Sequence, residues 1–146
     1  MKRLAFYVDS LAPAQLPYAA LKMVPSLQGR GKDVLVFADQ IVPPCIQPPC
    51  AVLQGTDAYG FTGVLVATSF VTAAKSLKTP AARRIFWLPD LEWMRRTDSF
   101  AAWAKVYRDP CLELVARSES HRLAVERAWN REVTVESPEF WAGLLD

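Results

Sequence analysis

The sequence lacks the features that identify several common classes of protein. No apolar run approaches the roughly 20 residues that a membrane-spanning helix needs, and the apolar segment near the start is too short for a signal peptide. Residues 9–17, which follow the first apolar run, contain no glycine, whereas a dinucleotide-binding turn needs the pattern G-x-G-x-x-G. The phosphate-binding pattern G-x-x-x-x-G-K-[ST] is absent as well. We therefore expect a cytoplasmic protein with no membrane span. We also expect no standard NAD or FAD site and no other cofactor.

Charge and cysteine content argue against two further classes. Lysine and arginine together number 17 against 15 for aspartate and glutamate, and they form no long basic stretch, so we expect no nucleic-acid partner. Cys45, Cys50 and Cys111 have no histidine at metal-binding spacing, and we expect no metal site. Cys45 and Cys50 could close a small loop as a disulfide, but free thiols are the expected state in the cytoplasm.

Short apolar runs alternate with helical patterns along the whole chain. The runs have the length and composition of buried strands and cover residues 4–8, 34–38, 51–53, 63–68, 85–88, 112–116 and 133–135. Because strand–helix–strand crossovers are nearly always right-handed, this order predicts a Rossmann-like, three-layer α/β fold. The expected sheet is mainly parallel with about seven strands, in a single domain over residues 1–146. We expect adjacent strands of one core to contain Val8, Val36, Val66, Phe86 and Val115.

The spacing of apolar residues predicts the helices between these strands. Leu16, Ala20, Met23 and Leu27 recur at steps of four, three and four, and Pro25 is expected to kink or shorten their helix. The later helices are predicted near residues 71–77 with Thr68 or Ser69 as N-cap, 100–107 with Thr97 or Asp98 as N-cap, 118–130 with Ser118 as N-cap, and 138–144.

Polar residues that directly follow the strands form the candidate site, because ligands of open α/β sheets bind at the carboxyl ends of the strands. Parallel strands deliver these ends to one edge of the sheet. We therefore expect one crevice to contain Ser10, Ser69, Asp90, Glu92, Ser118 and His121.

Asp90 and Glu92, with Trp93 beside them, form the first candidate group. Carboxylates can accept hydrogen bonds from sugar hydroxyls or deprotonate one of them, and an indole can stack on a sugar ring. In the alternative interpretation the two acids pair with Arg95 and Arg96 while Trp93 packs inward.

His121 is the only histidine and completes the catalytic candidates, since imidazole titrates near neutral pH and suits a general base. Its alternative role is that of a half-buried residue on a helix face. Ser118 and Glu119 are binding candidates at the start of the same helix. Alternatively, Ser118 caps that helix and Glu119 offsets its dipole. Ser10 and Ser69 are further binding candidates, at two other strand ends.

Three passages resemble sequences in the N-terminal, acceptor half of GT-B glycosyltransferases. Residues 27–37, LQGRGKDVLVF, are similar to the L-x-x-x-G-H-x-V-x-V passage after the first helix of those enzymes. Residues 114–121, together with 131–135, resemble the passage that closes that half. Residues 86–93, FWLPDLEW, resemble an aromatic and acidic strand end in the same half, and also phage-encoded glycosyltransferase-like proteins.

The resemblance implies a sugar or nucleotide-sugar ligand, but the chain departs from the GT-B pattern. The glycine-rich acceptor loop is absent, and the donor-binding second half is not in the sequence. Two functions stay open: a glycosyltransferase-like domain whose base is Asp90, Glu92 or His121, or a non-catalytic binding or assembly module of the same fold. A small flavodoxin-like or nucleoside-binding protein is a third. A half-enzyme exposes the face of its missing partner, so we expect a homodimer or a complex with a partner protein, with Trp129 or Trp141 at the contact.

Overall fold

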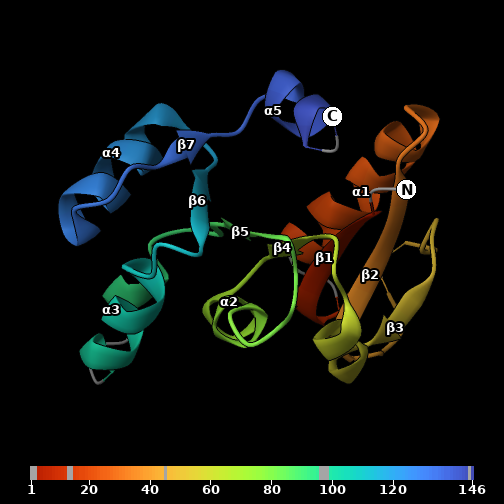
Figure 1. The fold of residues 1–146 in the computed structure, drawn as a ribbon, viewed down its shortest axis with the longest axis horizontal. Helices are drawn as coiled ribbons and strands as arrows, with labels where there is room; N and C mark the ends of the chain where they lie inside the picture. Colours follow the sequence, from red (N-terminus) through yellow and green to blue (C-terminus); the bar gives the residue numbers. More distant parts are fainter. Residues whose placement is uncertain (1–2, 13–14, 45, 96–98, 145) are drawn as a thin grey trace.

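The computed structural model describes residues 3–12, 15–44, 46–95, 99–144 and 146. Within these residues one sheet contains seven strands: β1 (Arg3–Ser10), β2 (Asp33–Gln40), β3 (Val52–Gln54), β4 (Val64–Ala67), β5 (Arg83–Trp87), β6 (Glu113–Ala116) and β7 (Thr134–Val135). All neighbouring strands are parallel, in the order β3-β2-β1-β4-β5-β6-β7. The Rossmann-like α/β fold predicted from the sequence is thereby confirmed (Figure 1).

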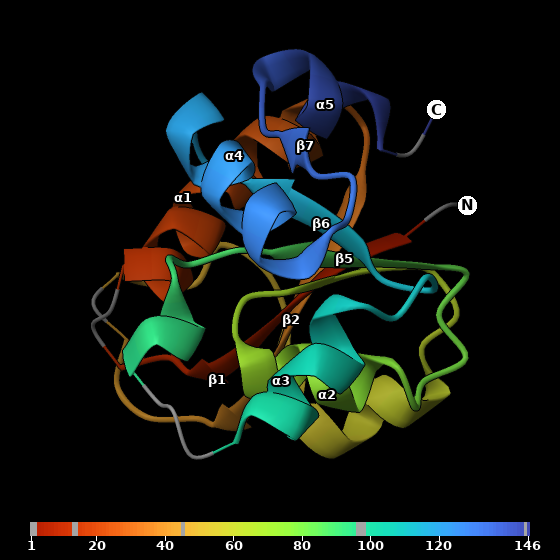
Figure 2. The same ribbon diagram turned by 90° about the vertical axis from the view of Figure 1, so that its left-hand side faces the viewer.

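Helices cover both faces of this sheet. They are α1 (Gln15–Gly29), α2 (Phe70–Ser76), α3 (Phe100–Tyr107), α4 (Glu119–Trp129) and α5 (Pro138–Gly143), with two short 3-10 helices, η1 (Gly55–Gly60) and η2 (Glu92–Arg95). Figure 2 shows α1 and α5 on one side of β5, with α2 and α3 on the other. Strands are added outward from β1 to β3 and then in the opposite direction from β4 to β7, so the strand order reverses between β1 and β4. Such a switch point is the usual ligand site of open α/β sheets.

Three clusters of buried hydrophobic residues cover the two faces of the sheet, and two of them contain the residues predicted from the strands. Val8, Val36, Val66 and Val115 share one core with α1 and α5, whereas Phe86 packs in another core with α3 and α4. The five residues lie in adjacent strands as predicted, but Phe86 does not share the core of the valines. The reason is that successive side chains of a strand point to opposite faces.

Two helices differ from the sequence prediction. Pro25 does not shorten α1, which continues through it to Gly29 with the proline at the exposed surface. In α2 the apolar Val71 is 46% exposed. The side chains that α2 buries are Thr72, Ala73 and Ser76. Small and polar residues therefore form the buried side of α2, a pattern that apolar spacing does not reveal.

The N-cap of α3 also differs from the prediction. Ser99 occupies the N-cap position and makes no capping hydrogen bond through its side chain. Thr97 and Asp98, the expected caps, lie outside the described residues. The other two cap predictions are confirmed, because Ser69 caps α2 and Ser118 caps α4 through side-chain hydrogen bonds.

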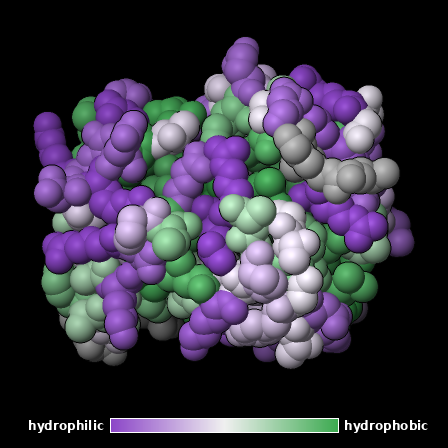
Figure 3. All heavy atoms as spheres, in the orientation of Figure 1, coloured by the Kyte–Doolittle hydropathy of each residue, from purple (hydrophilic) through white to green (hydrophobic). Residues whose placement is uncertain are grey.

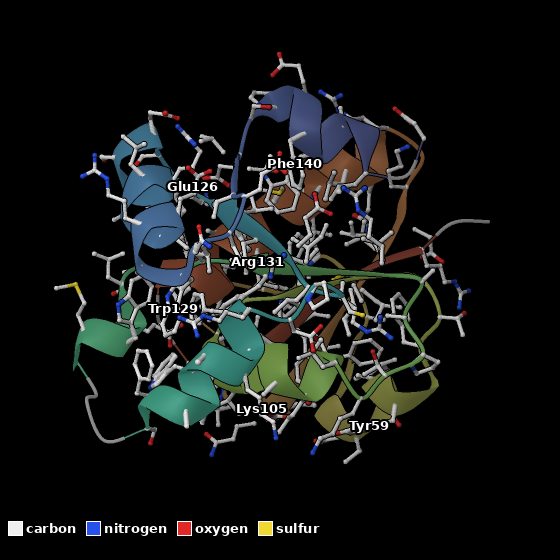
Figure 4. All side chains as sticks on the ribbon, turned by 60° about the vertical axis from the view of Figure 1, so that its left-hand side comes forward. Tyr59, Lys105, Glu126, Trp129, Arg131 and Phe140 are labelled. Carbon is white, nitrogen blue, oxygen red and sulfur yellow. The ribbon has the colours of Figure 1, made fainter. Side chains whose placement is uncertain are left out.

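The two tryptophans expected at a protein contact are buried within the chain itself. Trp129 is 1% exposed and stacks on Tyr107, with ring centroids 5.0 Å apart. It lies where the end of α4 meets α3 (Figure 4). Trp141 is 7% exposed and contacts Trp87, with centroids 4.9 Å apart. Both indoles pack mainly within the chain, and the predicted contact with a second protein stays a prediction.

Candidate functional site

A cavity of about 530 Å³ lies beyond the carboxyl ends of β5, β6 and β7. Its walls come from the loop after β5, the first turns of α4 and the residue that follows β7. The lining residues are Pro89, Asp90, Leu91, Arg117, Ser120, His121, Ala124 and Glu136. The volume is typical of small-molecule sites, which run from about 300 to 1,000 Å³. Two of the predicted catalytic residues, Asp90 and His121, therefore share one cavity.

Capping of α4 explains how His121 reaches this cavity. Ser118 has an extended backbone, and its hydroxyl accepts a 3.2 Å hydrogen bond from the backbone N–H of His121. The cap lies two residues after the end of β6, and α4 begins at the next residue, so His121 lies in the first helical turn. Glu119 is exposed, and its carboxylate pairs with Arg122, which lowers the pKa of Glu119. Ser118 and Glu119 thus act as helix-terminal residues, and neither lines the cavity.

Both nitrogens of the His121 imidazole are enclosed by the protein. Nδ1 accepts a long, 3.5 Å hydrogen bond from the backbone N–H of Arg117. Nε2 is buried, and the backbone of Asp90 lies next to the ring. Burial lowers the pKa of His121, while the adjacent backbone and carboxylate of Asp90 act in the opposite direction. Burial therefore disfavours the protonated imidazole, and the backbone of Arg117 occupies Nδ1.

Asp90 is the predicted acid that remains exposed on the cavity wall. Asp90 follows β5. Just before Asp90, the backbone N–H of Leu88 donates a hydrogen bond to the carbonyl of Val115 in β6. The loop is thereby held against β6 and the start of α4. A carboxylate in this position can accept hydrogen bonds from a bound molecule.

Arg117 and Glu136 form the charged wall of the same cavity. Arg117 directly follows β6 and Glu136 directly follows β7, and their side chains are 4.0 Å apart. Trp141 donates a 3.3 Å hydrogen bond from Nε1 to Oε2 of Glu136. Sequence analysis did not select these two residues, although both follow strands and the strand-end argument applies to them. Figure 3 shows hydrophilic side chains over much of α4, beside this region.

Tyr107 is a further polar residue that the sequence prediction missed. Its side chain is fully buried, and its hydroxyl has no hydrogen-bond partner within the part of the chain that the structure describes. Burial raises the pKa of Tyr107, and the carboxylates of Glu92 and Asp90 raise it further. The phenol ring contacts Trp93, the residue that follows Glu92 in η2. Helical spacing marks Tyr107 as a core residue but gives no indication of these neighbours.

Trp93 packs inward, as in one of the two interpretations of its sequence. Its ring contacts the edges of Tyr107 and Trp129, with centroid distances of 5.2 and 5.5 Å. The side chains of Arg95 and Arg96 are not among those that the structure describes. Their predicted pairing with Asp90 and Glu92 is therefore not tested. An indole held by two aromatic neighbours is fixed as part of the aromatic core.

Ser10 and Ser69 lie apart from the Asp90 cavity, at the switch point between β1 and β4. Ser10 accepts a 3.0 Å hydrogen bond from the backbone N–H of Ala12. Ser69 donates a 3.0 Å hydrogen bond to Oδ1 of Asp9 and forms a capping box with Thr72. The predicted residues therefore share one edge of the sheet, but they form two groups on it rather than one crevice.

Two structural searches limit the chemistry of these groups. Within the described residues, no three histidine, cysteine or acidic side chains are placed to hold a metal ion. None of the described helices has the length and apolar character needed to cross a membrane. Cys50 and Cys111 are free thiols, and Cys45 lies outside the described residues. Comparison with protein-family models, with curated proteins and with solved structures found no match.

Proposed function

We propose that the domain binds a hydroxyl-rich small molecule, a sugar or the sugar part of a nucleotide-sugar, in the Asp90 cavity. One observation carries the proposal: Asp90, Arg117 and Glu136 come from three successive strand ends and line the same cavity. Carboxylates accept hydrogen bonds, and a guanidinium donates them. A sugar hydroxyl both donates and accepts, so a wall that contains both kinds of group suits it. The resemblance to a GT-B acceptor half points to the same class of ligand.

The geometry favours a binding module over a domain in which His121 is the base. A general base must come within about 3 Å of the proton that it removes. The Nε2 atom of His121 is buried, and Nδ1 faces the backbone of Arg117. His121 therefore positions the Asp90 loop and the start of α4, and the ligand contacts fall to Asp90, Arg117, Ser120 and Glu136.

A catalytic role through Asp90 is the second candidate, supported by the exposure of that residue on the cavity wall. In such a transfer the acceptor O–H proton would move to Asp90. The acceptor oxygen would then bond to the anomeric carbon of a nucleotide-sugar, and the nucleoside diphosphate would leave with the electrons of the broken C–O bond. The nucleotide-sugar would be bound next to Asp90, by this domain or by a partner chain.

A thermal-shift panel tests the binding proposal. The panel contains UDP-glucose, UDP-N-acetylglucosamine and simple methyl glycosides, each with wild type, Asp90→Asn and the control Asp57→Asn, which changes an exposed residue of η1. A ligand at 100 times its dissociation constant stabilises the folded state by about 2.7 kcal/mol. We expect at least one compound to raise the melting temperature of wild type and Asp57→Asn but not of Asp90→Asn.

Absence of any shift, or an equal shift in Asp90→Asn, would contradict the proposal. Assaying the same proteins for release of UDP separates the two candidates. Release that disappears in Asp90→Asn while binding persists would establish the catalytic alternative.

A further inference from the structure

We propose that the switch point between β1 and β4 forms a second binding site, in which Asp9 and Lys75 hold a vicinal diol of a sugar. This site is separate from the Asp90 cavity and does not depend on the function proposed for it. Sequence analysis selected none of its charged residues. Its basis is a cluster of polar side chains that the fold brings together from four parts of the chain.

The strand register sets two carboxylates side by side at this edge. Val8 is paired with Ala38 and Ser10 with Gln40, so Asp9 of β1 lies next to Asp39 of β2. Lys75 approaches them from α2 on the same face. Placing two acids next to each other raises the free energy of the charged state, so each requires compensation from a donor or a cation.

Asp39 receives its compensation entirely from within the protein. The Tyr7 hydroxyl donates a 2.8 Å hydrogen bond to Oδ1, and Lys75 Nζ lies 2.7 Å from Oδ2. The backbone of η1 also comes close, because a Cβ atom on Gly55 would overlap Asp39 Oδ1. Asp39 therefore has a fixed position, and its bond to Lys75 fixes the ammonium group in turn.

Asp9 is compensated on one oxygen only. Ser69 donates a 3.0 Å hydrogen bond to Oδ1, whereas Oδ2 has no hydrogen-bond partner among the described residues. Partial burial raises the pKa of Asp9, the neighbouring Asp39 raises it further, and Ser69 and Lys75 lower it. Asp9 is an exposed residue, so its Oδ2 is an acceptor at the point where ligands of parallel sheets bind.

Lys75 supplies a donor beside this acceptor. An ammonium group has three N–H donors, and Asp39 uses one of them. The Lys75 side chain is 38% exposed and bonds to Asp39, the strand neighbour of Asp9. Adjacent hydroxyls of a sugar match this pair, because one hydroxyl can donate to Asp9 while the next oxygen accepts from Lys75. The same use of a strand-end acid is known for the ribose of dinucleotides.

Amide chemical shifts of the ¹⁵N-labelled protein test this site with a matched pair of ligands. Uridine carries the ribose vicinal diol, and 2′-deoxyuridine lacks it and is otherwise identical. Methyl β-D-glucopyranoside tests whether the site binds a pyranose. We expect uridine or the glucoside to shift the amides of Asp9, Ser10 and Ser69, and 2′-deoxyuridine to leave them unchanged.

Two substitutions connect the shifts to the proposed contacts. Asp9→Asn should weaken binding by about tenfold or more, since a hydrogen bond to a charged group contributes about 1.5–3 kcal/mol. Lys75→Met should weaken it as well, and Asp57→Asn should leave it unchanged. The amide spectrum of each variant shows whether it is folded. If Asp9→Asn does not fold, Lys75→Met alone provides the test.

Binding of uridine assigns a ribose and binding of the glucoside a pyranose, and either supports the site. The proposal is overturned if neither ligand shifts these amides, if 2′-deoxyuridine acts like uridine, or if the folded variants bind as wild type does. These outcomes do not depend on the Asp90 cavity, because the residues of that cavity lie at the other end of the carboxyl edge of the sheet.

Discussion

The Tyr7 hydroxyl donates a 2.8 Å hydrogen bond to Oδ1 of Asp39 and so connects β1 to β2 through their side chains. The Tyr107 side chain is also buried, yet its hydroxyl has no hydrogen-bond partner among the described residues. Loss of the two hydroxyls should therefore have opposite effects. Tyr7→Phe should lower the free energy of unfolding by about 1–3 kcal/mol, because a partly buried carboxylate loses a donor.

Tyr107→Phe should leave the free energy of unfolding unchanged or raise it by up to about 1 kcal/mol, because an unsatisfied buried polar atom is removed. Urea unfolding of both variants measures the two changes. Equal destabilisation by the two substitutions would show that Tyr107 has a partner that this account lacks.

Gly55 is required by the close approach of η1 to the Tyr7–Asp39 pair. A Cβ atom there would overlap Asp39 Oδ1 and lie 2.8 Å from the Tyr7 hydroxyl, whereas a Cβ atom on Gly60 would meet no atom within 4 Å. Gly55→Ala should cost about 1–3 kcal/mol, the usual range for overpacking, and Gly60→Ala much less. Denaturant unfolding of the two variants tests this, and equal effects would contradict the described position of η1.

Val66 and Val71 provide a test of the fold. Val66 is fully buried in β4 at the centre of the sheet, and Val71 is 46% exposed at the start of α2. Val66→Asp should leave the domain unfolded, because burial of an unpaired charge is among the largest single-residue penalties, above about 4 kcal/mol. Val71→Asp should change stability by about 0.5 kcal/mol or less. Circular dichroism decides the matter, and a folded Val66→Asp protein with unchanged melting would refute the topology.

His121 should make the protein less stable in mild acid. Burial lowers its pKa in the folded state below the ordinary value of 6.5. As the pH falls through that value the unfolded chain takes up a proton that the folded chain resists, so the free energy of unfolding decreases. The decrease should be smaller in His121→Gln. Urea curves at about pH 7.5 and about pH 5.5 measure it, and an equal decrease in both proteins would show that the imidazole is not desolvated.

The sequence predicts the strands and helices well because their signals are local. Runs such as residues 34–38 and caps such as Ser118 depend on neighbours within one element. The polar clusters are not local in this sense. Lys75 and Asp39 are 36 residues apart and meet only because α2 packs over β1 and β4, next to the end of β2. The enclosure of His121 depends on the path of the loop after β5, which residue spacing does not determine.

Two residues of the Asp90 cavity were nevertheless within reach of sequence reasoning. Arg117 and Glu136 directly follow predicted strands, and the carboxyl ends of parallel strands meet at one edge. Their charges, without an aromatic or a histidine beside them, are typical of solvated surface positions, and this made them inconspicuous. Tyr107 is missed for a different reason: its helical spacing with Trp103 indicates only a buried face.

The central claim is that this protein binds its ligand at the carboxyl edge of the sheet. Amide chemical shifts of the wild-type protein, recorded with the saccharide and nucleotide-sugar panel at millimolar concentration, test it most directly. The account predicts shifts at Asp90, Ser120 and His121, around the cavity that these residues line. Shifts confined to the opposite edge, at the cavity lined by Arg83, Glu113 and Arg131, or no shifts with any compound, would contradict it.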